Sequence, residues 1–448
     1  MIQLTDHGMY LVNGVPQETA ATAQEEARRR TMAWQILQAH NVSPDPMQLR
    51  IRFDAMVSHD ITYVGIIQQA RASGMKEFPI PYALTNCHNS LCAVGGTINE
   101  DDHMFGLSAA KKYGGIYVPA NQSVIHSYAR EQMAKCGSMI LGSDSHTRYG
   151  ALGTMAVGEG GPELAKQLLK NTWDTPMPKV VLVYLTGTPR QGIGPHDVAI
   201  ALVKATFESG FVNNCVLEFA GPGIKSLPID FRNGIDVMTT ETTCLSSIWE
   251  TDEVTRGFYE AHKRPEDYKP LHPGQDAYYD KMITIDLSRM ESMIALPFHP
   301  SNAWTIHEFL ENAEELLQKV DIIAPNREEL NEICPDIQGI DEQADFLLRQ
   351  GVGTVVVTLG AKGCYIRKDG QSRYFPAVTF PVFDASGAAD AFLSALTAYL
   401  YRGVEIAKAV EIANYAAGYS VSKEGVIPSL ISRQELDGYV QSLSRKNG

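Results

Sequence analysis

The sequence predicts an α/β fold, and three observations support this prediction. Short apolar runs alternate with helix-like stretches and glycine-rich turns over residues 78–185. Polar loops holding Cys, His, Asn, Asp or Ser follow three of these runs, as expected where parallel strands end and ligands gather. Hydrophobic residues make up 44% of the 448 residues and charged residues 20%, so a sizeable core can be buried.

The predicted elements of the first part of the chain follow in order. An apolar stripe among Glu, Gln and Arg predicts an amphipathic helix over residues 17–44, ending near Pro44. Residues 250–280 are polar, Pro-bearing and Tyr-rich, and are interpreted as a surface excursion. Short apolar runs predict buried strands at residues 78–86, 114–120, 138–144, 179–187 and 282–288.

The type of motif changes near residue 318, which predicts a domain boundary there. Residues 305–320 predict a helix, 352–370 a strand–turn–strand unit, 384–403 a loop opening into a helix, and 404–422 a second helix. At roughly 150 residues per domain the length allows about three domains. We therefore expect two α/β subdomains within residues 1–318 and a further domain over residues 319–448.

Charge and cysteine usage narrow the partners and the compartment. Asp and Glu number 52 against 38 Lys and Arg, a net charge of -14 that argues against a nucleic-acid partner. Seven scattered cysteines suit a reducing compartment. Neither a signal segment nor an apolar run of the roughly 18 residues that a membrane span needs is found. We expect a cytoplasmic protein with a small-molecule substrate and no membrane partner, and the oligomeric state is left open.

The first candidate site centres on Asp144, Ser145 and His146, which directly follow a predicted strand. Asp144 could orient His146 as a general acid or base, and Ser145 could bind a carboxylate. The next residues, 150–163, are rich in Gly and Ala and allow backbones to approach closely. The alternative is that Asp144 and Ser145 only cap a turn and that His146 is a loop histidine.

Several motifs in this region together resemble the aconitase family. They are N-C-H-N-S at 86–90, Q-S-V-I-H at 122–126, L-G-S-D-S-H-T at 141–147, Y-L-T-G at 184–187 and V-L-E-F-A-G-P-G at 216–223. The resemblance covers roughly residues 1–318 and implies three-layer α/β domains and a hydro-lyase that acts on a hydroxy-di- or tricarboxylate. Carried over residue by residue, it implies a catalytic set of His88, His126, Asp144, Ser145, His146 and Glu241.

The resemblance also implies a 4Fe–4S cluster, but its ligands are absent from this sequence. The family holds the cluster through an S-C-T-N-S block and a later C-x-x-C, and neither occurs here. The nearest pair, Cys87 and Cys92, is C-x4-C, whereas a cluster needs three or four converging thiolates. The family's Asp-His pair reads Cys87-His88. No protein-ligated metal site is predicted from the sequence.

The second candidate site is the run from Asp384 to Phe392, which precedes a predicted helix. Gly387, Ala388 and Ala389 at a helix N-terminus would offer free N–H groups to a phosphoryl group. Asp390, in the first turn, can accept the proton of an attacking hydroxyl. The alternative is that Asp and Ser act here as ordinary helix caps.

This block resembles the signature of the ribokinase-like (PfkB) carbohydrate kinases, and three further elements support the resemblance. They are Asn326 with Glu329 in an N-x-x-E element, Thr358, Gly360 and Gly363 in a T-x-G-x-x-G turn, and Asn414 in a later helix. The resemblance covers residues 319–448 and implies ATP and Mg binding, with Asp390 as the catalytic base and Gly387, Ala388 and Ala389 as the anion hole. It is restricted to the family's C-terminal, nucleotide-binding half, which makes the domain a partial one.

The sequence thus leaves two functions open. The chain is either an enzyme, in which ATP-dependent phosphoryl transfer is the better preserved but incomplete chemistry beside a hydro-lyase-like region, or a non-catalytic fusion or chimera. The second alternative would retain at most nucleotide or carboxylate binding.

Overall fold

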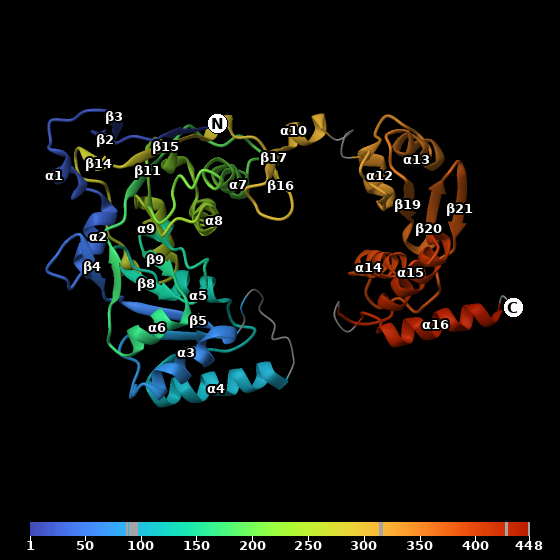
Figure 1. The fold of residues 1–448 in the computed structure, drawn as a ribbon, viewed down its shortest axis with the longest axis horizontal. Helices are drawn as coiled ribbons and strands as arrows, with labels where there is room; N and C mark the ends of the chain where they lie inside the picture. Colours follow the sequence, from blue (N-terminus) through green and yellow to red (C-terminus); the bar gives the residue numbers. More distant parts are fainter. Residues whose placement is uncertain (87, 89–96, 313–316, 426–428, 447–448) are drawn as a thin grey trace. The chain divides into compact units, whose positions relative to one another are not determined.

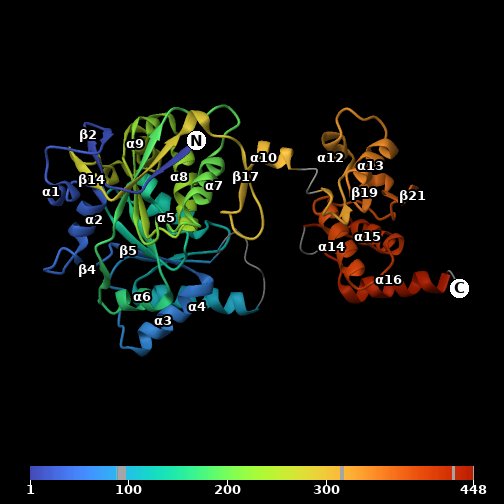
Figure 2. The ribbon, with the colours of Figure 1, turned by 45° about the horizontal axis from the view of Figure 1, so that its top comes forward.

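The computed structural model describes residues 1–86, 88, 97–312, 317–425 and 429–446, and for 442–446 the backbone alone. The chain divides into two compact units, Met1–Ile306 and His307–Gly448, so the division falls slightly before the predicted boundary at residue 318. Both units combine helices with parallel strands, which confirms the α/β class (Figures 1 and 2). None of the described helices is long and apolar enough to cross a membrane.

The first sheet of unit 1 consists of five parallel strands in the order β7-β6-β5-β8-β9. Alternate residues of its strands enter different cores: Met56 and Leu84 pack in one, Val57 and Ala83 in another. Helices therefore cover both faces of the sheet, α3, α4 and α6 on one and α5 on the other (Figure 1). The bounds are β5 Ala55–His59, β6 Tyr82–Thr85, β7 Ile116–Val118, β8 Met139–Gly142, β9 Met155–Gly158, α3 Asp60–Ala72, α4 Thr97–Tyr113, α5 Ile125–Gln132 and α6 Gly161–Leu168.

The second sheet of unit 1 has the order β1-β15-β11-β12-β13, with β1 antiparallel to β15 and the other pairs parallel. Its central strand β11 is a nearly continuous, mostly buried apolar run, as expected for a parallel strand covered on both sides. The bounds are β1 Ile2–Thr5, β11 Val180–Thr186, β12 Val216–Ala220, β13 Ser246–Trp249, β15 Lys281–Asp286, α7 Pro195–Thr206 and α8 Ile229–Met238.

Shorter elements complete unit 1. Small antiparallel sheets join β4 to β10, β2 to β3 and β14, and β16 to β17. The bounds are β2 Met9–Val12, β3 Val15–Gln17, β4 Gln48–Ile51, β10 Trp173–Pro176, β14 Ala277–Tyr279, β16 Met293–Ala295, β17 Ala303–Thr305, α1 Gln24–Arg28, α2 Met32–His40 and α9 Glu253–Ala261. Helix α10, Ile306–Glu311, begins at the last residue of unit 1 and otherwise belongs to unit 2.

Two of the predicted elements of unit 1 differ from the observed ones. The helix predicted over residues 17–44 is two helices, α1 and α2, because the N–H groups of Met32 and Ala33 donate to the buried carboxylate of Glu218 on β12. The segment 250–280 is more than a surface excursion: it contains α9, whose Tyr259 is fully buried and donates to the Leu152 carbonyl oxygen.

Unit 2 is a three-layer arrangement around a four-stranded sheet of order β18-β19-β20-β21. Val355 and Val357 of β19 pack with α12 and α13, whereas Val356 packs with α14 and α15, so helices cover both faces. The bounds are β18 Ile322–Ile323, β19 Thr354–Thr358, β20 Cys364–Lys368, β21 Gln371–Phe375, α12 Arg327–Ile333, α13 Ile340–Arg349, α14 Ala388–Tyr401, α15 Ile406–Ser420 and α16 Arg433–Lys446. The predicted strand–turn–strand unit and both predicted helices after residue 384 are present.

Candidate functional site

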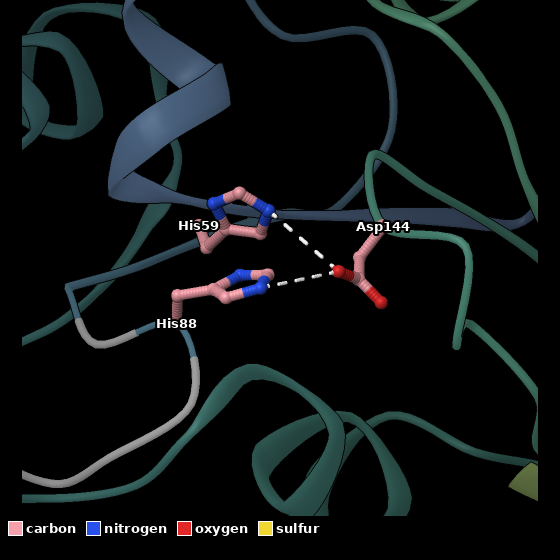
Figure 3. A group of neighbouring side chains, drawn as sticks. All are labelled: His59, His88 and Asp144. Carbon is pink, nitrogen blue, oxygen red and sulfur yellow. Dashed lines mark ion pairs between the residues drawn. The ribbon is translucent and has the colours of Figure 1, made fainter. Parts of the chain in front are cut away.

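The candidate site of unit 1 lies where three neighbouring strands of its first sheet end. His59 is the last residue of the central strand β5, His88 follows β6, and Asp144 follows β8. Because the three strands are parallel, their carboxyl ends meet at one edge of the sheet. Figure 3 shows His59 and His88 both directing a ring nitrogen toward the same oxygen of Asp144.

Asp144 is the hub of the site, and its two oxygens have different partners. Oδ1 accepts hydrogen bonds from His126 Nε2 at 2.9 Å and from the backbone N–H of His146 at 2.7 Å. Oδ2 faces His88 Nε2 at 3.5 Å and His59 Nε2 at 3.9 Å. Burial opposes ionisation of Asp144, but hydrogen bonds from His126 and His146 outweigh it and hold the pKa of this carboxyl well below its ordinary value.

Two of the histidines around Asp144 stay neutral. Burial and the neighbouring His88 lower the pKa of His59 to about 4. Burial also lowers the pKa of His126, although Asp144 opposes this effect. His126 has both ring nitrogens occupied, since its Nδ1 lies 3.2 Å from the hydroxyl of Tyr149. At neutral pH His126 therefore positions the carboxylate and carries no charge.

His146 is the histidine that favours the charged form. The hydrogen bond to Asp144 raises its pKa, burial opposes this effect, and the charge of Glu241 adds to it. His146 Nε2 lies 3.0 Å from Glu241 Oε1. Glu241 belongs to a 3-10 turn, Thr239–Thr242, that precedes β13, so the second sheet supplies this carboxylate to a site built at the end of the first.

Ser145 lies exposed between these groups. Its Oγ is 3.4 Å from His146 Nδ1, and its backbone carbonyl accepts a 2.7 Å hydrogen bond from Thr240 Oγ1. A Cβ atom at Gly158 would overlap the carbonyl oxygen of Asp144, so the loop can approach β9 only because that position is glycine. The small residues of the segment 150–163 thus allow the close backbone approach that the sequence predicted.

The structure brings together all six residues that the sequence proposed for this site: His88, His126, Asp144, Ser145, His146 and Glu241.

Three further histidines near the site were missed. His59 ends a strand that was not predicted, and the signal for it was the polar run Ser58-His59-Asp60 directly after the apolar run 55–57. His103 Nε2 pairs with Asp60 Oδ2 at 3.0 Å, and His299 Nε2 lies 3.7 Å from Glu241 Oε2. Neither of the last two carried a signal in its local sequence.

A 4Fe–4S cluster does not fit the residues that the structure describes. Cys136, Cys215 and Cys244 of unit 1 are buried, and no three cysteines among the described residues converge on one point. Cys87 and Cys92 lie outside the described residues. Within the described part of the chain, the one set of three His, Cys, Asp or Glu side chains that could hold a metal ion consists of His59, His88 and Asp144.

The N-x-x-E element of unit 2 forms a helix cap. Asn326 Oδ1 accepts from the N–H groups of Glu328 and Glu329 at 2.8 and 2.9 Å, and Glu329 Oε2 accepts from Asn326 N at 2.7 Å. This reciprocal pair is a capping box at the start of α12. The backbone of Asn326 also forms an isolated parallel β-bridge with Thr358 at the end of β19. Two of the predicted nucleotide-binding elements therefore lie side by side.

The other predicted residues of unit 2 lie on the β19–β20 turn and on α14 and α15. A Cβ atom at Gly363, which has a φ of 96°, would overlap the backbone near Phe375, so this turn requires glycine. Asn414 is buried, and its amide donates to the Pro376 carbonyl oxygen. The Gly360 position, with a φ of 58°, faces open space.

The start of α14 agrees only in part with the predicted anion hole, because the N–H group of Ala388 donates to the carbonyl oxygen of Ala385 at 3.3 Å. Gly387 has the left-handed conformation, with φ 79°, and precedes Ala388 as the N-cap residue. Among the described residues, the backbone N–H groups of Ala389 and Asp390 have no protein acceptor. The Asp390 side chain is exposed beside them.

Two family models match the chain. The model of the aconitase family (aconitate hydratase) matches residues 34–338, and the model of the pfkB family of carbohydrate kinases matches residues 274–433. A region of aconitase type is therefore followed by a region of PfkB type.

Curated proteins similar to the chain include mitochondrial aconitate hydratases. That of Schizosaccharomyces pombe is 29% identical over 280 residues, covering 59% of this chain and 35% of that protein. That of Aspergillus fumigatus is 28% identical over 335 residues, covering 69% and 42%. An aconitase–ribosomal protein bL21m fusion protein of Schizosaccharomyces pombe is 26% identical over 322 residues, covering 64% and 35%. The chain spans about two fifths or less of the length of these relatives.

Solved structures similar to the chain include ribokinases. Ribokinase from Thermotoga maritima has a TM-score of 0.29 and 16% identity, covering 59% of this chain and 96% of that one.

Proposed function

We propose that this chain, which belongs to the aconitase family, binds a hydroxy-di- or tricarboxylate beside Asp144 and moves protons at it, as a hydro-lyase does. The observation that carries the proposal is the meeting of four imidazoles and Glu241 around Asp144 at the carboxyl ends of parallel strands. Elimination of water needs a group that protonates the departing hydroxyl, and this group must hold its proton near neutral pH.

His146 suits that role best. Asp144 and Glu241 raise the pKa of its imidazole, which favours the protonated form that a general acid needs. Glu241 Oε1 lies at hydrogen-bonding distance from His146 Nε2. Its negative charge can therefore stabilise the protonated imidazole after a substrate has bound. The exposed hydroxyl of Ser145 is free to donate to a substrate carboxylate next to the same imidazole.

The remaining groups hold the site in place. His126 fixes one oxygen of Asp144, and Thr240 ties the Ser145 backbone to the turn that carries Glu241. These contacts join loops from the two sheets. They therefore keep the imidazole of His146 and the hydroxyl of Ser145 at a defined separation. The 4Fe–4S cluster of the family is assigned no part, since the described cysteines do not converge.

The test uses the full chain and aconitate, the compound in the names of the relatives. We expect aconitate to raise the melting temperature, and its hydration to lower the ultraviolet absorbance of the conjugated double bond. Asp144→Asn removes the charge that holds the imidazoles and should lower kcat/KM at least 100-fold, about 2.7 kcal/mol of transition-state stabilisation.

His40→Gln is the matched control. His40 Nε2 pairs with Asp54 at 2.8 Å, the same kind of contact, but Asp54 precedes β5 and lies at the opposite end of that strand. This variant should keep the aconitate response. The proposal is contradicted if the wild type, with its fold intact by circular dichroism, shows no melting shift and no turnover at millimolar aconitate and other hydroxy-tricarboxylates.

A second function, Mg-ATP binding by unit 2, is favoured by one observation: the unpaired N–H groups of Ala389 and Asp390 at the start of α14. Millimolar Mg-ATP should then raise the melting temperature of the unit. Asp390→Asn should preserve that shift, since backbone groups bind the phosphates, and abolish any transfer to an added sugar. No shift with Mg-ATP would leave α14 a structural helix alone.

A further inference from the structure

We infer that His59, His88 and Asp144 together bind one divalent first-row transition-metal ion. Their three ligand atoms, two Nε2 and Oδ2, lie within 4.8 Å of one another (Figure 3). Ligand atoms at about 2.1 Å from a metal lie roughly 3 to 3.5 Å apart. The 3.5 Å between His88 and Asp144 already meets this range, and the longer separations require side-chain shifts of about an ångström.

The carboxylate is prepared for this role by the difference between its two oxygens. Oδ1 accepts two hydrogen bonds, from His126 and from the His146 backbone, and these fix the plane of the group. Oδ2 faces only the two imidazoles among the described residues. A ligating carboxylate is commonly held in this manner, with one oxygen on the metal and the other on outer-shell donors.

The contacts of the protein alone do not explain why the His59 side chain is buried and directed toward Asp144. The side chain of His59 is 4% exposed, and its Nδ1 has no hydrogen-bond partner within the described part of the chain. Its Nε2 is 3.9 Å from Asp144, too far for a hydrogen bond. A buried imidazole that makes no hydrogen bond is costly, and a bound ion at Nε2 accounts for its direction toward the carboxylate.

The donor set limits the ion. Two imidazole nitrogens and one carboxylate oxygen suit Zn²⁺, Fe²⁺, Co²⁺ or Mn²⁺ and disfavour the all-oxygen preferences of Ca²⁺ and Mg²⁺. Three protein ligands leave coordination positions free, as in catalytic rather than structural sites. The inference deepens the proposed function and rests on the same loops: a bound ion would polarise the hydroxyl of a hydroxy-carboxylate near His146.

The test is equilibrium dialysis of the full chain, purified without a polyhistidine tag and stripped with a chelator, against Co²⁺ or Zn²⁺. We expect one ion per chain at micromolar metal, and visible absorption bands of Co²⁺ bound by nitrogen and oxygen. His59→Gln and Asp144→Asn should each weaken binding at least 10-fold, the effect of losing one ligand. His40→Gln, which disrupts a histidine–aspartate pair away from the site, should leave the stoichiometry at one.

The outcomes separate this inference from the proposed function, because metal binding is measured without substrate. Absence of saturable binding in the wild type, or one ion retained in both ligand variants, would overturn the inference even if aconitate still binds. If His59→Gln fails to fold, His88→Gln replaces it, since the His88 side chain is 26% exposed and tolerates substitution better. Metal binding without any aconitate response would keep the inference and reject the function.

Discussion

At the scale of single residues, two carboxylates of unit 1 are held by identified partners. Asp144 is ionised because His126 and His146 donate to it, and the buried Arg232 is paired with both oxygens of Asp252 at 2.8 Å. Such pairs contribute less to stability than their count suggests, but breaking one leaves an uncompensated charge. Single substitutions at these pairs therefore have large and interpretable effects.

Asp252→Asn should lower the free energy of unfolding by about 3 kcal/mol at pH 7, since Arg232 is fully buried and would lose its counter-charge. Burial opposes ionisation of Asp252, yet the hydrogen bonds and charge of Arg232 lower its pKa below the ordinary 3.8. A lowered folded pKa contributes stability that is present above the unfolded value and is lost as the pH falls through the folded one. Urea unfolding should thus find the difference between wild type and variant shrinking below about pH 4.

Glu253→Gln is the control for this prediction. Glu253 is the first residue of α9, directly after the N-cap residue Asp252, and pairs with Arg256 at 3.4 Å with its side chain 82% exposed. Solvent screens that pair, so no measurable loss is expected. A loss at Glu253 as large as at Asp252 would refute the argument from burial.

At the scale of elements, the motifs that resemble the two families also have structural functions of their own. The run at 216–223 contains Glu218, which holds the start of α2, and Gly221, which turns the chain at the end of β12. In unit 2 the N-x-x-E element is a capping box. The same motif can therefore stabilise the fold as well as form part of a site, and its presence alone does not show that the protein is active.

Gly221→Ala should destabilise unit 1 by about 1–3 kcal/mol. Gly221 has a φ of 113°, and a Cβ there would lie 2.6 Å from the carbonyl oxygen of Leu185 on the neighbouring strand β11. Gly192→Ala is the matched control, because Gly192 has a φ of 90° but nothing within 4 Å of the added atom. Thermal unfolding should show a smaller loss of stability for Gly192→Ala than for Gly221→Ala. Equal losses would mean that the positive φ alone, and not the contact with Leu185, destabilises the variant.

At the scale of the whole molecule, each unit has its own hydrophobic cores. The core of β19 and the helices α14 and α15 contains only residues after 306, whereas the cores of the two large sheets contain only residues before it. Units with separate cores unfold separately. The full chain should therefore give two transitions in calorimetry.

Limited proteolysis should give two stable fragments with a cut between residues 306 and 321, identified by mass spectrometry. One concerted transition, or rapid digestion of either fragment, would contradict the independence of the units. A fragment of residues 1–306 that unfolds at the same temperature as in the full chain would support it.

The sequence by itself indicated the α/β class, the positions of β6, β7, β8, β11, β15, β19, β20, α14 and α15, and Asp144 with five residues around it, because strand ends, turns and family motifs are local signals. The tertiary structure decided what depends on distant contacts. The break between α1 and α2 requires Glu218, far along the chain, and the convergence of His59 with His88 and Asp144 requires three parallel strands in adjacent register. No protein metal ligand was expected from the sequence because these three residues are far apart along it, and only the pairing of β6, β5 and β8 brings their side chains to one edge of the sheet.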